Sequence, residues 1–249
     1  MAANQTPPAN TNLTGGAAGG APEYPSAFSL FKPSWEGLKQ NLTELIVIWI
    51  VPTIAFAVLA LISESAFNNS NDGTGALFAA LAAVVGIFYV AFIGPAVVHI
   101  QLKSSLMEKA TYDSAWETSK KYWWRFILLA IMVGVTVLVG FILFIVPGII
   151  FLKRYFLSHY ALIDQDLGLT ESMHKSNELS RNRSMSIYGV IGVDILINIP
   201  QIIPVLGYIV TFVLQIAYFC APAIRYQQLK GVKPAPAAAS ARPATATRS

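Results

Sequence analysis

The sequence contains little charge and only one cysteine. Lys, Arg, Asp and Glu make up 12% of its 249 residues, about half the roughly 25% share of soluble domains. Because a soluble domain carries charged side chains on its surface, this composition argues against that class. The lone cysteine, Cys220, excludes a disulfide framework or a cysteine metal cluster within one chain.

Long apolar blocks, by contrast, are abundant. Hydrophobic residues make up 55% of the chain, and residues 45–62 and 76–98 are two of the longest apolar blocks. A block of about 18 or more apolar residues can cross the roughly 30 Å of hydrocarbon in a bilayer. The sequence therefore predicts an all-α, polytopic integral membrane protein, and buried core helices of a soluble protein are the weaker alternative.

The two ends differ from this pattern. Residues 1–27 are rich in Ala, Asn, Pro and Gly, and they lack the basic start and apolar core of a cleavable signal peptide. Residues 232–249 repeat Pro and Ala. Such compositions bury too little apolar surface to order a chain, so we expect two disordered tails around a membrane domain of residues 28–231.

Six transmembrane helices are predicted, arranged as three helical hairpins with amphipathic cytoplasmic segments. Apolar residues at three- and four-residue spacing in 31–45 indicate a helix along the membrane surface, and 170–179 has the composition of a second surface helix. The expected membrane helices cover about 45–62, 76–98, 126–146, 149–163, 186–202 and 208–226.

The connections carry polar or turn-forming residues. A polar loop, 63–75, joins the first two helices, and a long basic connection, 101–125, follows the second. Pro147 and Gly148 are predicted to form the tip of the second hairpin, because a Pro-Gly pair removes a helical hydrogen bond and permits a tight turn. Residues 204–207 are expected to form the third tip.

Basic residues set the expected orientation. Of the 17 Lys and Arg residues, all except Lys153 and Arg154 fall in the tails or in two loops on one side of the six-helix arrangement. The positive-inside rule makes that side cytoplasmic, so we expect a multi-pass protein of the plasma membrane with both termini in the cytoplasm. Four tryptophans would anchor the same interface: Trp35, Trp116, Trp123 and Trp124.

Five crossings are the competing topology. One helix would run from 126 through 152, placing Lys153 and Arg154 beyond the membrane but the basic C-terminal tail outside the cell. With six crossings the two cations lie in the outer half of the fourth helix and must snorkel or pair. Because loop charge normally sets orientation, six crossings are preferred.

The chain contains a candidate internal repeat. Three times a cytoplasmic segment leads into a predicted hairpin. Residues 94–96 (GPA) and 101–103 (QLK) match residues 221–223 (APA) and 228–230 (QLK) at identical spacing. Unless this is coincidence among apolar residues, the fold is three copies of one unit around a common axis.

The stretch from Pro147 to Arg181 (PGIIFLKRYFLSHYALIDQDLGLTESMHKSNELSR) resembles a known family. It is similar to the membrane domain that precedes the catalytic domain in some glycerophosphodiester phosphodiesterases, and to related stand-alone bacterial membrane proteins. The shared pattern comprises Trp116 and Lys120 ahead of a helix, the Pro-Gly pair, an Asp-x-x-x-Gly turn and Ser176 in a short helix. The resemblance covers about residues 28–231 and implies a six-helix membrane module. It implies no phosphodiesterase activity, which belongs to a separate soluble barrel.

The sequence holds no pattern that carries catalytic chemistry. Its histidines are dispersed, and it has neither a phosphate-binding Gly-rich loop nor a Gly-x-Ser-x-Gly elbow. Asp164 and Asp166 could bind a cation, although capping of the following helix and solvation are the more ordinary roles. We expect no enzyme, metal site or cofactor. The net charge of +4 fits basic loops beside anionic headgroups better than nucleic acid.

A polar stripe within an apolar helix is the unusual feature. Asp194, Asn198 and Gln201 lie at i, i+4 and i+7 and so share one helix face. An ionisable residue in the bilayer costs about 2.5–3.5 kcal/mol on insertion scales and suggests function, although polar residues also form contacts between helices. We expect Asp194 to face the protein interior and to pair with Arg154, with Asn198 or Lys153 as the next partner to consider.

Three functions remain open. The first is a non-catalytic membrane module in envelope organisation, lipid handling or partner binding, whose partners would be anionic membrane lipids or a membrane protein. The alternative is a transporter or permeation protein with its polar site near Asp194. A membrane enzyme acting on lipids is the third, and no motif supports it.

Overall fold

The computed structural model describes residues 24–69, 74–181, 183–202 and 206–231. Within these ranges the regular structure is entirely helical, which confirms the predicted all-α class. Both predicted tails lie outside the described residues, apart from residues 24–27.

The helices follow one another through short connections. They are a 3-10 turn (Phe28–Leu30), α1 (Phe31–Lys39), α2 (Leu42–Leu45), a π-helical segment (Ile46–Ile50), α3 (Val51–Asn69), α4 (Thr74–Ser105), α5 (Tyr112–Leu143), α6 (Ile145–Tyr155), α7 (Ser158–Asp164), α8 (Leu169–Ser180), α9 (Ser184–Asn198), a 3-10 segment (Ile199–Ile202), α10 (Leu206–Tyr218) and α11 (Ala221–Lys230).

Two expected loops are largely helical. α3 continues through most of the polar segment 63–75, and the basic connection 101–125 is divided between the end of α4 and the start of α5. Thr111 starts α5 with a capping box, because its hydroxyl accepts from the Ser114 N–H while the Ser114 hydroxyl accepts from the Thr111 N–H. Such caps start a helix in polar sequence, where apolar spacing gives no signal.

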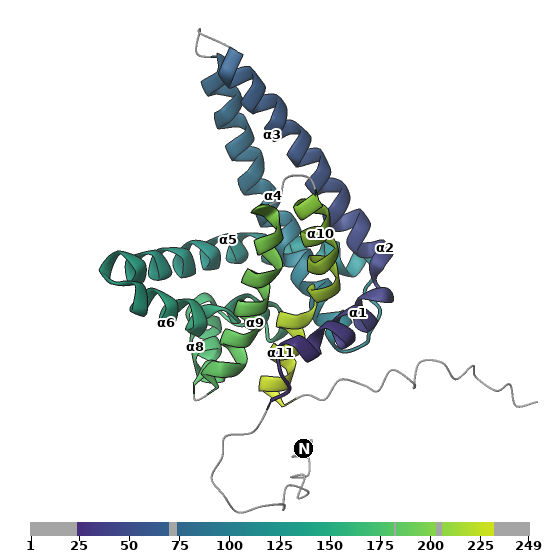
Figure 1. Cartoon of the computed structure of the whole chain (residues 1–249), viewed down its shortest axis with the longest axis vertical. Helices are drawn as coiled ribbons and strands as arrows, with labels where there is room; N and C mark the ends of the chain where they lie inside the picture. Colours follow the sequence, from purple (N-terminus) through teal and green to yellow (C-terminus); the bar gives the residue numbers. More distant parts are fainter. Residues whose placement is uncertain (1–23, 70–73, 182, 203–205, 232–249) are drawn as a thin grey trace, which may run out of the picture.

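Three pairs of consecutive helices pack together, α3 with α4, α5 with α6, and α9 with α10, and α4 also packs extensively on α5. The pairs spread from a common base at which α1, α8 and α11 gather (Figure 1). Their outer parts expose large apolar side chains, such as Ile142 (74%) and Phe144 (75%). Within the described residues, four helices are long and apolar enough to cross a membrane, which supports the predicted membrane character. They cover 76–105, 112–143, 184–202 and 206–230.

The buried core lies at the base, where the pairs meet. One large cluster combines Leu102 of α4, Leu157 at the cap of α7, Leu162 within α7, and Leu229 of α11. A second cluster packs α1 against α9 and α11. The stable interior is therefore built from the short helices and the inner ends of the pairs.

The second pair turns at Phe144, ahead of the predicted tip. Phe144 has an extended backbone (φ −165°, ψ 155°) between α5 and α6. Pro147 lies in the first turn of α6, where a missing N–H removes no helical hydrogen bond. Gly148 lies on the contact with α5, and a Cβ atom there would come within 2.5 Å of the Phe141 ring. Pro147 and Gly148 therefore start and pack α6 instead of forming the tip.

The turn at Phe144 argues against the continuous helix that the five-crossing arrangement requires. α5 ends at Leu143, and α6 packs back along it (Figure 1). A continuous helix from 126 to 152, on which the five-crossing arrangement depends, is therefore not formed.

Buried serines hold the pairs at their bases. The Ser34 hydroxyl of α1 accepts from the backbone N–H of Cys220 at 2.9 Å, where α10 ends and α11 begins. The Ser176 hydroxyl of α8 accepts from the N–H of Leu157 at 3.1 Å and donates to the carbonyl of Arg154 at 2.7 Å, where α6 gives way to α7. Each break leaves backbone groups without a helical partner, and the serine supplies one.

A third serine bonds to the first pair. Ser119 of α5 donates to the carbonyl of Phe92 at 2.6 Å, three residues before Pro95 in the continuous helix α4. Thus Ser34 of α1 bonds to the third pair, Ser119 of α5 to the first, and Ser176 of α8 to the second. We call these residues the clamp serines and the contacts that they make the clamps. Because each clamp joins one unit to another, the three clamps link the units in a closed cycle.

The clamps bring out a third copy of the sequence repeat. Each of the three sites carries a phenylalanine that is followed nine residues later by a glutamine: Phe92 and Gln101, Phe156 and Gln165, Phe219 and Gln228. Sequence comparison matched only the first and third copies, because His159 stands in the second copy where the others have proline. The residue four positions before each clamp serine is also buried: Leu30, Ala115 and Ser172.

Residues 24–27, which the sequence assigned to the N-terminal tail, contact the folded part. The buried Arg225 donates from Nη2 to the Pro25 carbonyl at 2.7 Å, and its guanidinium lies 5.9 Å from the centre of the Tyr24 ring. The Tyr218 hydroxyl donates to the Ala27 carbonyl at 3.1 Å. These contacts fix the segment to the base.

Replacement of a clamp serine should destabilise the base. Ser176→Ala leaves the buried Leu157 N–H without its partner, which costs about 1–3 kcal/mol, so the midpoint of thermal unfolding in detergent should fall. The matched control is Ser65→Ala on the exposed surface of α3, which should leave the midpoint unchanged. Equal midpoints for both variants would show that the Ser176 bonds contribute nothing.

Candidate functional site

The predicted polar stripe is formed, and a fourth residue extends it. The Asn198 side chain donates from Nδ2 to the Asp194 carbonyl at 2.7 Å. Its Oδ1 accepts from Gln201 at 3.0 Å and, across the pair, from Gln215 of α10 at 3.4 Å. These residues follow one side of the third helix pair and connect α9 to α10.

Asp194 does not face the interior of the single chain. Its side chain is exposed, and among the described residues no salt bridge joins it to Arg154 or Lys153. The expected pairing is therefore wrong. The sequence placed the two residues on successive membrane helices, whereas in the structure α9 meets α6 at its first residue, where Ser184 accepts from Lys153.

Lys153 and Arg154 lie in a polar pocket of about 400 Å³ between α6, α8 and α9. Lys153 donates from Nζ to the Ser184 hydroxyl at 2.8 Å, and Nζ lies 5.8 Å from the centre of the Tyr188 ring. We call this the basic pocket, and its lining residues are Lys153, Arg154, Asn177, Ser180, Arg181 and Ser184.

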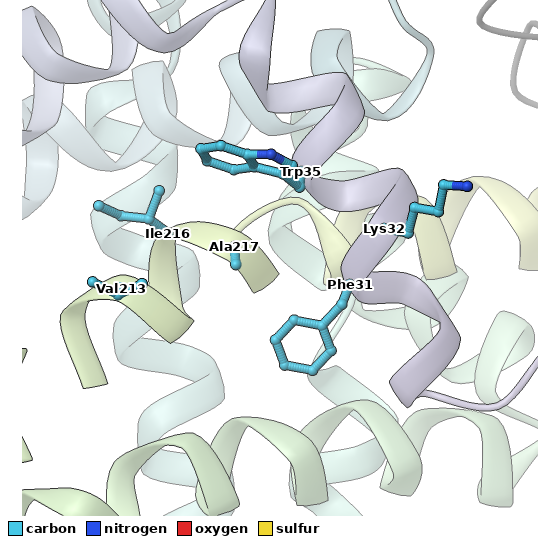
Figure 2. A pocket seen from close by; sticks show the side chains of 6 residues that line it. All are labelled: Phe31, Lys32, Trp35, Val213, Ile216 and Ala217. Atoms are coloured by element: carbon cyan, nitrogen blue, oxygen red, sulfur yellow. The ribbon is translucent and has the colours of Figure 1, made fainter. Parts of the chain in front are cut away.

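An apolar pocket of about 530 Å³ lies between α1 and α10 (Figure 2). In Figure 2, Trp35 and Phe31 extend from α1 towards the side of α10 that carries Ile216, while Lys32 points away from them. We call this the apolar pocket, and its lining residues are Phe31, Lys32, Trp35, Val213, Ile216 and Ala217. A second apolar hollow, of about 690 Å³, lies between the first pair and α5.

The predicted aromatic anchors lie on α1 and near the start of α5. Trp35, Trp116 and Trp124 are exposed, and the Lys39 ammonium lies 5.6 Å from the centre of the Trp35 ring. Trp123 instead stacks on Phe92 of α4 at 5.6 Å. Three of the four tryptophans are therefore free to contact a membrane interface, whereas Trp123 packs the first pair against α5.

The acidic turn after α7 binds cations of the chain itself. Asp164 accepts from Lys230 at 2.7 Å, and Asp166 accepts from Lys121 at 2.8 Å. The Lys121 hydrogen bond holds the pKa of the Asp166 carboxyl below its usual value. Neither carboxylate caps α8, whose cap residue is Gly168. Within the described residues no group of three His, Cys, Asp or Glu could hold a metal ion.

The comparisons with known proteins give no relative. No family model, curated protein or solved structure matches the chain. The resemblance to the phosphodiesterase membrane domain stays a prediction, and the pockets and the polar stripe are the available basis for a function.

Sequence reasoning missed most of the basic pocket. Lys153 and Arg154 stood out as charges inside an apolar block, but Asn177, Ser180, Arg181 and Ser184 did not. Arg181 lies just before a predicted membrane helix, which was a usable signal. Spacing alone does not reveal that α8 and the foot of α9 pack on α6.

Asp194 and Arg154 should act independently. Because they are not in contact, the destabilisation of Asp194→Leu with Arg154→Leu should equal the sum of the single changes within about 0.5 kcal/mol. Detergent unfolding of the wild type, both single variants and the double variant measures this. A coupling free energy above about 1 kcal/mol would support the salt bridge that the sequence predicted.

Proposed function

We propose that the chain is a non-catalytic integral membrane module that binds anionic lipid at its cytoplasmic face. The observation that carries this is the division of its surface. Large apolar side chains cover the outer parts of the three pairs, whereas cations gather at their base. A monomeric soluble protein rarely exposes apolar surface on this scale, and basic residues at a membrane surface attract anionic headgroups.

Each helix pair is proposed to enter the membrane from the cytoplasmic side as a hairpin. The clamps, the short helices and the predicted cytoplasmic segments all lie at the base (Figure 1). Entry from one side also leaves both termini in the cytoplasm, as the distribution of Lys and Arg favours.

The first and third hairpins are proposed to cross. The second is proposed to penetrate part of the way, although α5 alone is long and apolar enough to cross. Lys153 bonds to Ser184 at the foot of α9, which places it at the cytoplasmic interface if α9 crosses. Phe144 at the tip is nine residues from Lys153, or about 14 Å at helical rise. That is about half of a roughly 30 Å core. This arrangement avoids placing two cations in the outer half of the bilayer.

Cysteine labelling from outside the cell tests this topology. A membrane-impermeant thiol reagent should modify Asn68→Cys and Ile202→Cys, which lie near the tips of the first and third pairs, but not Phe144→Cys. The wild-type protein gives the background labelling, because its one cysteine, Cys220, is fully buried.

Two sites at the base complete the labelling experiment. Lys109→Cys and His174→Cys are exposed and should react only after the cells are permeabilised. Labelling of Phe144→Cys from outside would favour six full crossings. Labelling of His174→Cys from outside would contradict the cytoplasmic base.

The polar stripe favours a second function. Asp194, Asn198 and Gln215 would face the surroundings of a single chain within an apolar helix pair. Polar groups at that depth are ordinarily satisfied by other helices or by water. A transporter or permeation role would therefore require a second copy or a membrane protein partner to enclose the stripe.

Lipid selectivity separates these functions. The purified chain in detergent should be stabilised by phosphatidylglycerol but not by phosphatidylcholine with the same acyl chains, because only the former carries net negative charge. Unfolding midpoints measure this. No lipid product should form during prolonged incubation, and headgroup release would instead establish an enzyme.

A further inference from the structure

We propose that the basic pocket binds the phosphate group of an anionic phospholipid headgroup. The inference rests on the proposed lipid-binding function and assigns it a site. The pocket gathers Lys153 and Arg154 from α6, Arg181 from the end of α8, and Ser184 from the start of α9. Cationic donors from α6 and from the end of α8 thus converge on one volume with the Ser184 hydroxyl of α9.

The fold does not require these charges. Lys153 and Arg154 stand three and two residues before Phe156, and Ile216 and Ala217 stand at the same distances before Phe219. Both sets line a cleft beside a clamp helix, α8 in one case and α1 in the other. The chain therefore builds the same cleft once with an apolar lining and once with a basic one.

The clamp that holds the basic pocket also fixes one of its cations. Ser176 donates to the carbonyl of Arg154 and accepts from the N–H of Leu157. The adjacent residue of the helix, Asn177, lines the pocket, as Trp35 next to Ser34 lines the apolar pocket. Backbone positions on both sides are therefore set before a ligand arrives.

The donors in the pocket are available to an anion. The lining includes no carboxylate, and among the described residues Lys153, Arg154 and Arg181 form no salt bridge. The nearby Glu178 is taken by Lys175 at 3.0 Å. Arg154 and Arg181 are exposed, so their guanidinium groups can bind phosphate oxygens in the bidentate manner that Arg favours.

The start of α9 adds further donors. Its cap residue, Arg183, makes no side-chain capping bond. Ser184, the first residue of this 15-residue helix, lines the pocket, so the first N–H groups, which have no intrahelical partner, lie beside it. The positive end of a helix dipole favours an anion at this place. Arg183 itself donates to the Leu229 carbonyl at 2.7 Å and is not a lining residue.

The surroundings favour a lipid over a free phosphate. Met185, next to Ser184, is 86% exposed, and Ile149, one turn from Lys153 towards the tip, is 42% exposed. An acyl chain can lie along these residues while the phosphate occupies the pocket. A soluble phosphate compound would gain nothing from this apolar border.

Lipid titration with a charge-matched control tests the site. The test variant is Lys153→Gln, Arg154→Gln, Arg181→Gln, and the control is Lys39→Gln, Lys109→Gln, Lys120→Gln, which removes the same charge from exposed positions of the base. Native mass spectrometry of the full chain would measure the dissociation constants of phosphatidylglycerol and of phosphatidylcholine with equal acyl chains.

The test variant should bind phosphatidylglycerol at least about tenfold more weakly than the wild type, because it loses charge-assisted hydrogen bonds. The control should keep its affinity within about twofold, as expected for exposed charges. An unchanged elution volume and unfolding midpoint would show that the test variant is folded. Arg154→Lys, which keeps the charge and loses the planar fork, should show a smaller loss and secures the result if the triple change unfolds.

Four outcomes overturn the inference in distinguishable ways. Equal loss in the test variant and the control would show that binding follows net charge and not this site. Displacement of the lipid by excess inorganic phosphate would assign the pocket to a soluble phosphate. A wild-type chain without preference for phosphatidylglycerol would remove the proposed function as well, whereas a test variant that retains the preference removes the site alone.

Discussion

A break in a helix leaves backbone N–H and C=O groups without partners, and in a dry interior those groups must be satisfied. This constraint governs the base of the molecule. The second and third helix pairs are interrupted at their inner ends, at Leu157 and Cys220, and a serine hydroxyl from another unit bonds to the backbone at each interruption. In the first pair the Ser119 hydroxyl bonds to the Phe92 carbonyl of the continuous helix α4. Because each unit satisfies the next, the pairs can differ in length and direction while the base stays common.

The repeated base also explains how one scaffold offers different surfaces. The clefts beside α1 and α8 are equivalent in position, yet one is lined by Trp35 and Ile216 and the other by Asn177 and Lys153. The clamp serines bond to backbone groups, so the same clamp can form beside clefts that carry different side chains.

Much of the architecture follows from local signals in the sequence. Apolar length predicts the helical membrane character, and three- and four-residue spacing predicts α1. The tip of the second pair was misplaced because Pro147 tolerates two roles, a turn residue or a first-turn helical residue, and sequence does not choose between them. The polar connection before Trp116 was taken as a loop because its helix starts from a capping box and not from an apolar face.

The sites were harder to predict, since they depend on contacts between distant elements. Asp194 shares a face with Asn198 as expected, because that relation lies within one helix. Arg154 was wrongly predicted as its partner, because the position of α9 relative to α6 depends on tertiary packing. Lys153 and Arg154 were recognised as anomalous charges, and only the packing of α8 against α6 places Arg181 beside them.

The cycle of clamps has a consequence for the order of folding. Ser176 reaches back only 19 residues to Leu157, and Ser119 reaches back 27 residues to Phe92. Ser34 must wait for Cys220, 186 residues later in the chain. During synthesis the first two closures can form as the chain emerges, while the amphipathic helix nearest the N-terminus stays without its partner until the last pair is made. The contact between the first and third units is therefore the last of the three to form. The base can be complete only after residue 220 has been synthesised.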